Sequence, residues 1–214
     1  MRHAVLGAAI AVVLVAGSLP AVSAETTGNG SEGAALVVID IQNFYFPGGQ
    51  MPLVGADEAA AKAAELVACF RRAGQPVIWV QHLPTGVNAP DPTGIEEPYR
   101  MRANLLPAEG EAVIGKHYAN AFRGTDLEAT LRRFGVKKLV ICGMQTHMCV
   151  EAAVRAAADL GFEVTVVPDA CATRDLEFGD VTVPAAEVQA AALAAMTSAY
   201  AKAVPVAELC TNMP

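Results

Sequence analysis

Short apolar runs alternate with longer, more polar segments along most of the chain. The runs span four to six residues and are rich in Val and Ile. Runs this short and this rich in β-branched residues predict buried strands. We therefore expect strands at 35–39, 76–80, 112–115, 138–143 and 163–167, and a last one at 203–206.

The segments between these runs have the end signals of helices. Three of them finish at a glycine, Gly74, Gly135 or Gly161, which is the usual residue just after a helix. Thr125 and Glu128 fit a capping box, in which each side chain bonds the other residue's backbone N–H. The expected helices are 56–73, 125–134, 147–160 and 184–201.

Strands and helices that alternate in this way form a parallel sheet with helices on both faces. We predict an α/β fold of three layers, α-β-α, with a doubly wound and mostly parallel sheet of about six strands. Ligands of such folds bind beyond the carboxyl ends of the strands. The candidate site residues are therefore Asp40, 81–82, Lys116, 143–149 and Asp169.

The first 33 residues differ in character from the rest. A basic start precedes an uncharged apolar run, and Val22 and Ala24 occupy the two positions that a signal peptidase reads. We expect a cleavable secretory signal peptide at 1–24, a polar Gly-rich linker at 25–33, and one domain at 34–214. This reading implies export to the periplasm or the medium, with no membrane contact after cleavage. A retained membrane anchor is the alternative.

Composition narrows the classes of partner. The chain has 15 Lys and Arg residues against 22 Asp and Glu residues, for a formal net charge of −7. This acidic balance leaves no basic stripe for phosphates, so we expect no nucleic-acid partner. The sequence has no P-loop motif, and its one G-x-G-x-x-G match, at 28–33, lies in the polar stretch before the first expected strand instead of between a strand and a helix, so we expect no cofactor. The stretch 82–110 carries five prolines, and its length favours a loop that covers a site.

Three of the residues at strand ends could act together. Cys149 falls near the start of a helix, where the dipole favours a thiolate. Asp40 follows an apolar strand, and a carboxylate at that depth needs a partner, which Lys116 could supply. Each residue alone has an ordinary reading: a packed thiol, a turn cap and a surface lysine. Their common place at carboxyl ends of separate strands favours chemistry.

Three segments, in this order, resemble the isochorismatase-like cysteine hydrolases and together extend over most of the domain. They are ALVVIDIQNFYF around Asp40, GKHYANAFRGTDLEATLRRFGVKKLVICG from Gly115 onward, and GMQTHMCVEAAVRAAADLGFEVTVVPDACATRD at 143–175. The resemblance implies that Asp40 is a general base, Lys116 its partner and Cys149 the nucleophile. It also implies a cis peptide bond between Met144 and Gln145, which turns the N–H groups of Gln145 and Cys149 toward a substrate oxygen.

The reaction that this resemblance implies is hydrolysis of a C–N bond in a small amide, through a thioester on Cys149. Family members that cleave the vinyl ether of isochorismate do so without the cysteine. A vinyl-ether hydrolase driven by Asp40 is therefore an alternative, and so is a non-catalytic binding protein on the same fold. The resemblance further implies a homo-oligomer. It does not specify the substrate.

Metal-binding members of the family carry an Asp-x-His motif after the second strand, where this chain reads QHLP at 81–84. We therefore expect a metal-free enzyme of the amidohydrolase branch. Gln42 is expected to support the Asp40 loop. For His82, a hydrogen bond to a loop backbone is the alternative to substrate contact, and for the aromatic residues it is core packing. The expected pocket residues are Phe44, Tyr45, His82 and Phe122.

The other four cysteines bear on the redox state. Cys142 lies inside an expected strand and reads as a packed thiol, and Cys69 lies on an expected helix. Cys171 and Cys210 are a possible pair, although spacing alone does not show whether their Cβ atoms meet. Because the nucleophile must stay reduced, we expect few or no disulfides, even though export would permit them.

Overall fold

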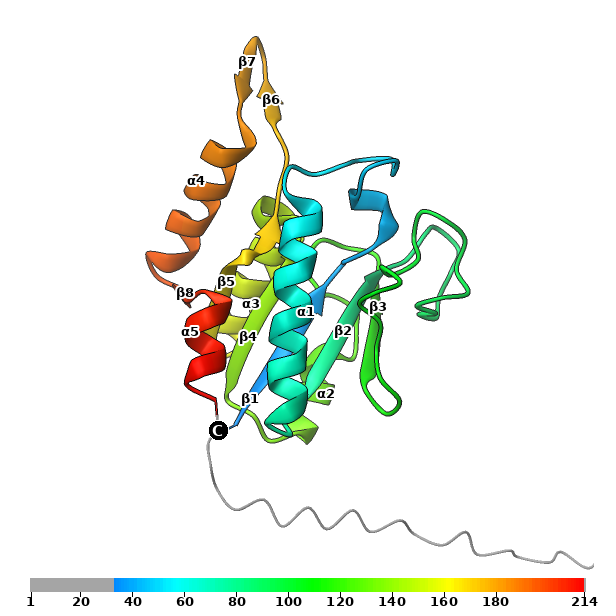
Figure 1. Cartoon of the computed structure of the whole chain (residues 1–214), viewed down its shortest axis with the longest axis vertical. Helices are drawn as coiled ribbons and strands as arrows, with labels where there is room; N and C mark the ends of the chain where they lie inside the picture. The colour runs from blue at the N-terminus through cyan, green and yellow to red at the C-terminus, as the bar shows by residue number, and fades with distance from the viewer. Residues whose placement is uncertain (1–32, 214) are drawn as a thin grey trace, which may run out of the picture. The chain divides into compact units, whose positions relative to one another are not determined.

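The computed structural model describes residues 33–213, which form a parallel six-stranded sheet with helices on both faces (Figure 1). The order across the sheet is β3-β2-β1-β4-β5-β8, and every neighbouring pair is parallel. The predicted three-layer α/β fold is confirmed. The strands are β1 Ala34–Ile39, β2 Val77–His82, β3 Ala112–Lys116, β4 Lys138–Met144, β5 Glu163–Ala172 and β8 Ala201–Ala203.

The expected signal peptide at 1–24 and nearly all of the expected linker lie outside the described residues. Within residues 33–213, none of the helices has the length and apolar character needed to cross a bilayer.

Strand β1 lies in the middle of the sheet and is apolar on both faces. Residues 35–39 are at most 1% exposed, because helices cover the sheet on each side. Ile39 pairs with Val80 of β2 on one side and with Gly143 of β4 on the other. This register brings Asp40 and Met144, the next residue of each strand, to the same edge of the sheet.

The helices divide between the two faces. The chain winds from β1 through β2 to β3 in one direction and from β4 to β5 in the other, so right-handed crossovers place α1 on one face and α2 and α3 on the opposite face. Helix α5 packs against α1. The helices are α1 Ala56–Arg72, α2 Leu127–Arg133, α3 Glu151–Asp159, α4 Ala185–Thr197 and α5 Val206–Thr211, with a 3-10 turn η1 at Asn43–Tyr45 and a π turn η2 at Thr146–Val150.

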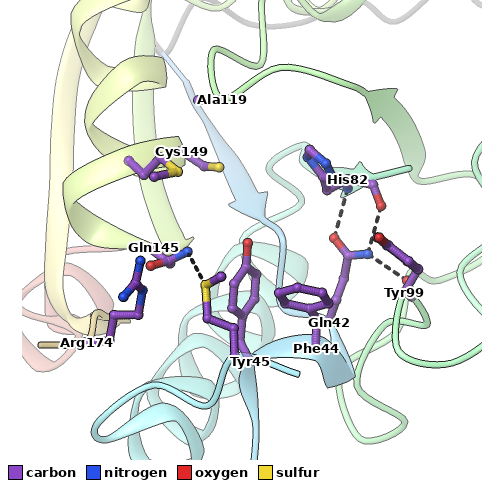
Figure 2. A pocket seen from close by; sticks show the side chains of 11 residues that line it. Gln42, Phe44, Tyr45, His82, Tyr99, Ala119, Gln145, Cys149 and Arg174 are labelled. Carbon is purple, nitrogen blue, oxygen red and sulfur yellow. Dashed lines mark hydrogen bonds between the residues drawn. The ribbon is translucent and has the colours of Figure 1, made fainter. Parts of the chain in front are cut away.

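The winding direction reverses between β1 and β4. In open α/β sheets the crevice at this reversal, beyond the carboxyl ends of the strands, is where ligands bind. Asp40 follows β1 there, and Gln145 follows β4. Figure 2 shows the side chains that gather at this edge.

The C-terminal part differs from the expected elements. The expected helix 184–201 ends at Thr197, and the expected strand 203–206 is replaced by β8 and α5. Pairing of β8 with β5 overrides the helix propensity of this Ala-rich stretch. Pro205 explains why the strand stops early, because proline cannot donate to a sheet but is tolerated where a helix begins.

Strand β5 is longer than expected and leads into a hairpin that the sequence pattern did not predict. It continues past Pro168 to Ala172, and the hairpin strands are β6 Leu176–Phe178 and β7 Val181–Val183. Asp169, a candidate site residue, therefore lies within β5. Its carboxylate accepts a hydrogen bond of 3.1 Å from the Val206 N–H at the start of α5. The residues that β5 delivers to the site edge are instead those around 172–174.

The start of α2 also differs. The helix begins at Leu127, and the Thr125 hydroxyl accepts a hydrogen bond from the Leu127 N–H at 3.3 Å instead of from Glu128. The same hydroxyl donates to the Ala121 carbonyl at 2.6 Å. The capping box is therefore not formed, because Thr125 closes the preceding turn.

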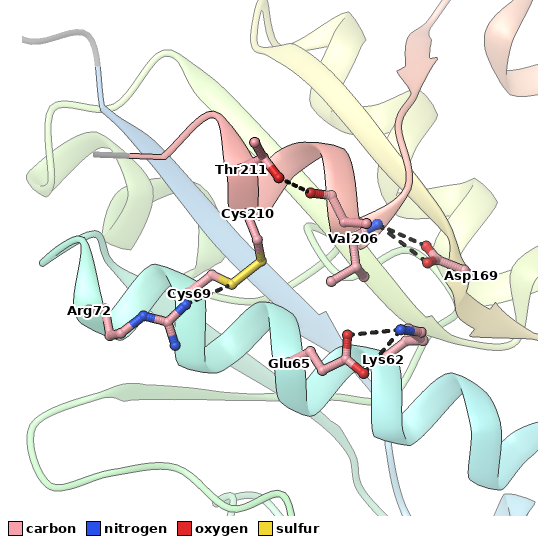
Figure 3. The surroundings of a disulfide bond; sticks show 9 residues. Lys62, Glu65, Cys69, Arg72, Asp169, Val206, Cys210 and Thr211 are labelled. Carbon is pink, nitrogen blue, oxygen red and sulfur yellow. Dashed lines mark hydrogen bonds and ion pairs between the residues drawn. A yellow bond between two sulfur atoms is a disulfide. The ribbon is translucent and has the colours of Figure 1, made fainter.

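A disulfide joins Cys69 of α1 to Cys210 of α5 (Figure 3). The possible pair of Cys171 with Cys210 does not form, because Cys171 lies buried in β5 beside Gly143 whereas α5 packs against α1. This one bond agrees with the expectation of few or no disulfides, and Cys142 and Cys149 are free thiols as expected, as is Cys171. The disulfide fastens the end of the domain to its first helix, 141 residues away in sequence.

Removing this disulfide is expected to destabilise the domain without disabling the site. The double substitution Cys69→Ala and Cys210→Ala frees a long loop in the unfolded chain and should lower the free energy of unfolding by about 2–4 kcal/mol. Urea unfolding of the oxidised protein and the variant measures the difference. Adding a reductant should lower the stability of the parent protein but leave the variant unchanged, and equal stabilities would show that the bond does not stabilise the fold.

Candidate functional site

Asp40 and Lys116 form a fully buried ion pair at the carboxyl edge of the sheet. Asp40 follows β1 and Lys116 ends β3, and their side chains are 0% exposed, with 2.7 Å between Lys116 Nζ and Asp40 Oδ2. Asp40 has a φ of 50°, in the left-handed region that non-glycine residues rarely adopt. A buried charge persists only with a partner, and each of these residues supplies it for the other.

The same lysine contacts the cysteine. Its Nζ lies 3.3 Å from Cys149 Sγ and 3.3 Å from His82 Nδ1. Burial acts to lower the pKa of Lys116, but Asp40 and Cys149 outweigh it, and the pKa lies above its ordinary value. Lys116 therefore stays charged and joins the carboxylate to the thiol.

Cys149 lies in the π turn η2, between β4 and α3, and is 3% exposed. Burial, followed by the neighbouring Asp40 carboxylate, raises the pKa of its thiol to about 12, although Lys116 acts to lower it. The expectation that the helix start favours a thiolate is outweighed by these two effects. At neutral pH the resting thiol keeps its proton, so its reaction requires a base.

The turn after β4 has an unusual backbone. The Met144–Gln145 peptide bond is cis, and the Gln145 carbonyl accepts hydrogen bonds of 3.1 Å from the N–H groups of both Met148 and Val150. Gly143 has a φ of 127°, and a Cβ there would collide with the Ile39 carbonyl of β1. Only glycine fits this close contact between the two strands.

Cys149 faces a cavity of about 240 Å³, which we call the Cys149 cavity. Of the predicted pocket residues, Phe44, Tyr45 and His82 line it, whereas Phe122 does not, because its ring packs against Phe162 at 6.5 Å between centroids. Figure 2 shows Cys149 and Gln145 on one side and Phe44, Gln42 and His82 on the other. The lining residues are Gln42, Phe44, Tyr45, Met51, His82, Tyr99, Ala119, Gln145, Met148, Cys149 and Arg174.

Gln42 ties the long loop to the site. Its amide nitrogen donates to the carbonyls of His82, at 2.9 Å, and Tyr99, at 2.6 Å, and its amide oxygen accepts from the His82 N–H at 2.8 Å. Gln81 holds the same loop by donating to the Asp91 carbonyl at 3.0 Å. These bonds place Tyr99 at the cavity and explain how the expected covering loop is fixed.

The His82 ring is half-buried and points toward Lys116. Burial, and then the charge of Lys116, lowers the pKa of His82 below its ordinary value. The ring is therefore neutral at pH 7. The alternative in which the His82 side chain bonds a loop backbone is not what the structure shows. The ring contacts Lys116, and it is the backbone of His82 that bonds the side chain of Gln42.

Sequence reasoning missed several cavity residues, of which Arg174 is the charged one. It follows β5, which continues to Ala172, past the expected strand end at 167. Met51, Tyr99 and Met148 come from the stretch after η1, the long loop and η2, where periodicity carries no signal. Among residues 33–213, no group of three or more His, Cys, Asp or Glu side chains has an arrangement suited to a metal ion.

The chain is similar in sequence and in structure to known proteins. The family model for the isochorismatase domain matches residues 34–208. The uncharacterized isochorismatase family protein YddQ of Bacillus subtilis is 46% identical over 171 residues, 78% of this chain and 93% of that protein. The ureidoacrylate amidohydrolase RutB of Methylobacterium radiotolerans is 33% identical over 153 residues, 56% of this chain and 59% of that protein. The crystal structure of an isochorismatase hydrolase from Oleispira antarctica has a TM-score of 0.79 and 45% identity, covering 86% of this chain and 100% of that one. The chain belongs to the isochorismatase-like hydrolase family.

Proposed function

We propose that this protein is a cysteine amidohydrolase that cleaves a C–N bond of a small molecule without a metal. The observation that carries the proposal is the position of Lys116 Nζ, 2.7 Å from Asp40 Oδ2 and 3.3 Å from Cys149 Sγ. A nucleophile, a base and a cation that holds both, with the sulfur facing a cavity, are the parts that acyl transfer requires. The amidohydrolase named among the similar proteins supports the choice of an amide bond.

The first step is activation of the thiol. Because the pKa of Cys149 is raised to about 12, the sulfur gives its proton to Asp40 as it attacks, and Lys116 stabilises the negative charge that develops on it. The Sγ–C bond forms at the amide carbonyl. Asp40 then passes its proton to the leaving nitrogen, and the C–N bond breaks. Water, activated by the same carboxylate, hydrolyses the thioester and restores the thiol.

The oxyanion of the tetrahedral intermediate is assigned to the backbone N–H groups of Gln145 and Cys149. The two hydrogen bonds that the Gln145 carbonyl accepts hold this turn in place before substrate binds. Donors fixed in advance cost no reorganisation during the reaction, and one such donor contributes about 10²–10³-fold in rate.

Export remains part of the proposal, and so does association into a homo-oligomer. The Cys69–Cys210 disulfide supports export, because such bonds persist in oxidising compartments. Burial of Cys149 limits attack by external disulfides, which allows a free nucleophilic thiol in the same compartment. Cell fractionation with a tagged full-length chain tests export, and sedimentation velocity tests the homo-oligomer.

Trapping the acyl-enzyme tests the proposed chemistry. A panel of small primary amides is screened for ammonia release, and each active amide is then incubated with hydroxylamine, which should compete with water for the thioester and yield a hydroxamate. Mass spectrometry of acid-quenched enzyme should show the acyl group on the peptide that contains Cys149. Ammonia release with neither hydroxamate nor adduct would contradict a thioester mechanism.

A further inference from the structure

Arg174 brings a positive charge to the Cys149 cavity, whose other lining residues are aromatic, sulfur-containing, amide or small, apart from the neutral His82. Figure 2 shows the guanidinium beside Gln145, on the same side of the cavity as Cys149. Arg174 itself is half-buried. A cation at a partly buried cavity attracts a negatively charged group of a ligand, because the low dielectric strengthens the interaction between the two charges.

The guanidinium of Arg174 has donors to spare. Its Nε is buried without a hydrogen-bond partner among the described residues, and its Nη1 donates one long bond, 3.3 Å, to the Asp175 carbonyl. A guanidinium has five N–H donors in a planar fork that matches a carboxylate. A buried N–H donor without an acceptor costs free energy, so an acceptor on a bound ligand would complete the hydrogen bonding of this guanidinium.

Several other arginines of the domain pair with carboxylates, whereas Arg174 does not and is the one arginine among the cavity-lining residues. Arg71 pairs with Glu111 at 2.8 Å and Arg155 with Glu151 at 2.6 Å. Arg174 forms no ion pair within residues 33–213. His147 is a titratable neighbour of Arg174. Burial, and then Arg174 itself, lowers the pKa of His147, so its ring is neutral at pH 7.

We propose that Arg174 binds a carboxylate of the substrate, so that the enzyme acts on small amides that also carry a carboxylate. This inference rests on the proposed function, because it assigns the second recognition element of the same site. A carboxylate fits the fork of the guanidinium in a bidentate manner, and the aromatic side chains of Phe44, Tyr45 and Tyr99 line the same cavity as Arg174 and Cys149. The volume of about 240 Å³ lies below the roughly 300–1,000 Å³ of drug-sized sites, which favours a small substrate.

Iodoacetate and iodoacetamide form a matched pair of probes for this charge. With either reagent, Cys149 Sγ displaces iodide from the CH2 carbon, and the two differ only in carrying a carboxylate or a carboxamide. We measure the rate of alkylation of Cys149 by peptide mapping and divide the iodoacetate rate by the iodoacetamide rate. The same ratio for glutathione corrects for intrinsic reactivity.

In the parent protein the corrected ratio is expected to favour iodoacetate. Arg174→Gln should lower it by about tenfold or more, mostly through slower reaction with iodoacetate, because a charge-assisted bidentate contact is lost. Arg174→Lys should retain part of the preference. Arg123→Gln is the matched control, since Arg123 is exposed and stacks on Tyr118, 3.8 Å from the ring centroid, outside the cavity. It should leave the ratio unchanged.

Two kinds of failure are distinguishable. If Cys149 reacts readily with both reagents but Arg174→Gln leaves the ratio unchanged, the carboxylate site is wrong and the cysteine mechanism survives. If neither reagent labels Cys149, the proposed nucleophile is wrong, and calorimetry on the Cys149→Ala protein then decides the carboxylate site. Succinamate should bind about tenfold or more tightly than succinamide, and Arg174→Gln should remove that difference. Equal affinities for both, or no measurable affinity for either, would overturn the inference.

Discussion

Replacing Cys149 with alanine is expected to reduce kcat/KM for amide substrates by about 10³-fold or more. The substitution removes the atom that forms the thioester but leaves Asp40 and Lys116 paired beside the cavity. Ammonia release over a range of amide concentrations measures the loss. The same variant separates the proposed amidase from a vinyl-ether hydrolase driven by Asp40, which would keep its rate without the sulfur.

Cys171→Ala is the matched control for this experiment. Cys171 is also a buried free thiol, and burial raises its pKa to about 12, as it does for Cys149. It does not line the Cys149 cavity. The control should therefore suffer a similar small loss of stability from the vacated volume while retaining turnover. Full activity of the Cys149→Ala protein would rule out the nucleophilic mechanism.

The sheet was predictable because its central strands are buried on both faces. Such strands read as uninterrupted apolar runs, and the alternation with helices leaves few topologies once crossovers are right-handed. The sequence pattern was less informative for the end of β5 and for the C-terminal stretch. Pro168 and the Ala-rich tail gave no local sign that β5 would continue to Ala172 or that 201–203 would pair with it, because both depend on tertiary contact.

The site divides in the same way. Asp40, Lys116 and Cys149 follow or end strands, so the fold rule found the region and the family resemblance assigned the roles. The structure brings the three together. The sequence could not predict that Arg174 lines the cavity or that Cys210 pairs with Cys69. Each depends on where a segment outside the periodic pattern lies in space. Phe122 was expected in the pocket because it lies close to Lys116 in sequence. That proximity does not determine the direction of its ring, which packs against Phe162.

Breaking the Asp40–Lys116 pair is expected to have the second large effect, on stability and on the thiol together. Asp40→Asn or Lys116→Met leaves the other charge buried without its partner, which should lower the free energy of unfolding by about 3–5 kcal/mol. Both variants should lose turnover by about 10²–10⁴-fold, since proton transfer fails. Urea unfolding and ammonia release measure the two losses.

The thiol should respond to the two substitutions in opposite directions. Asp40 raises the pKa of Cys149 and Lys116 lowers it, so Asp40→Asn should increase the thiolate fraction and Lys116→Met should decrease it. The rate of iodoacetamide alkylation of Cys149 at pH 8 reports that fraction, because only the thiolate reacts. The double variant, which removes both charges, should lose less stability than the sum of the single losses. Changes of the same sign in both single variants, or strictly additive losses, would show that the two residues do not act on Cys149 as one unit. A faster-alkylating but inactive Asp40→Asn protein would separate the two tasks of the carboxylate, because a more nucleophilic sulfur cannot replace the proton transfer that Asp40 performs.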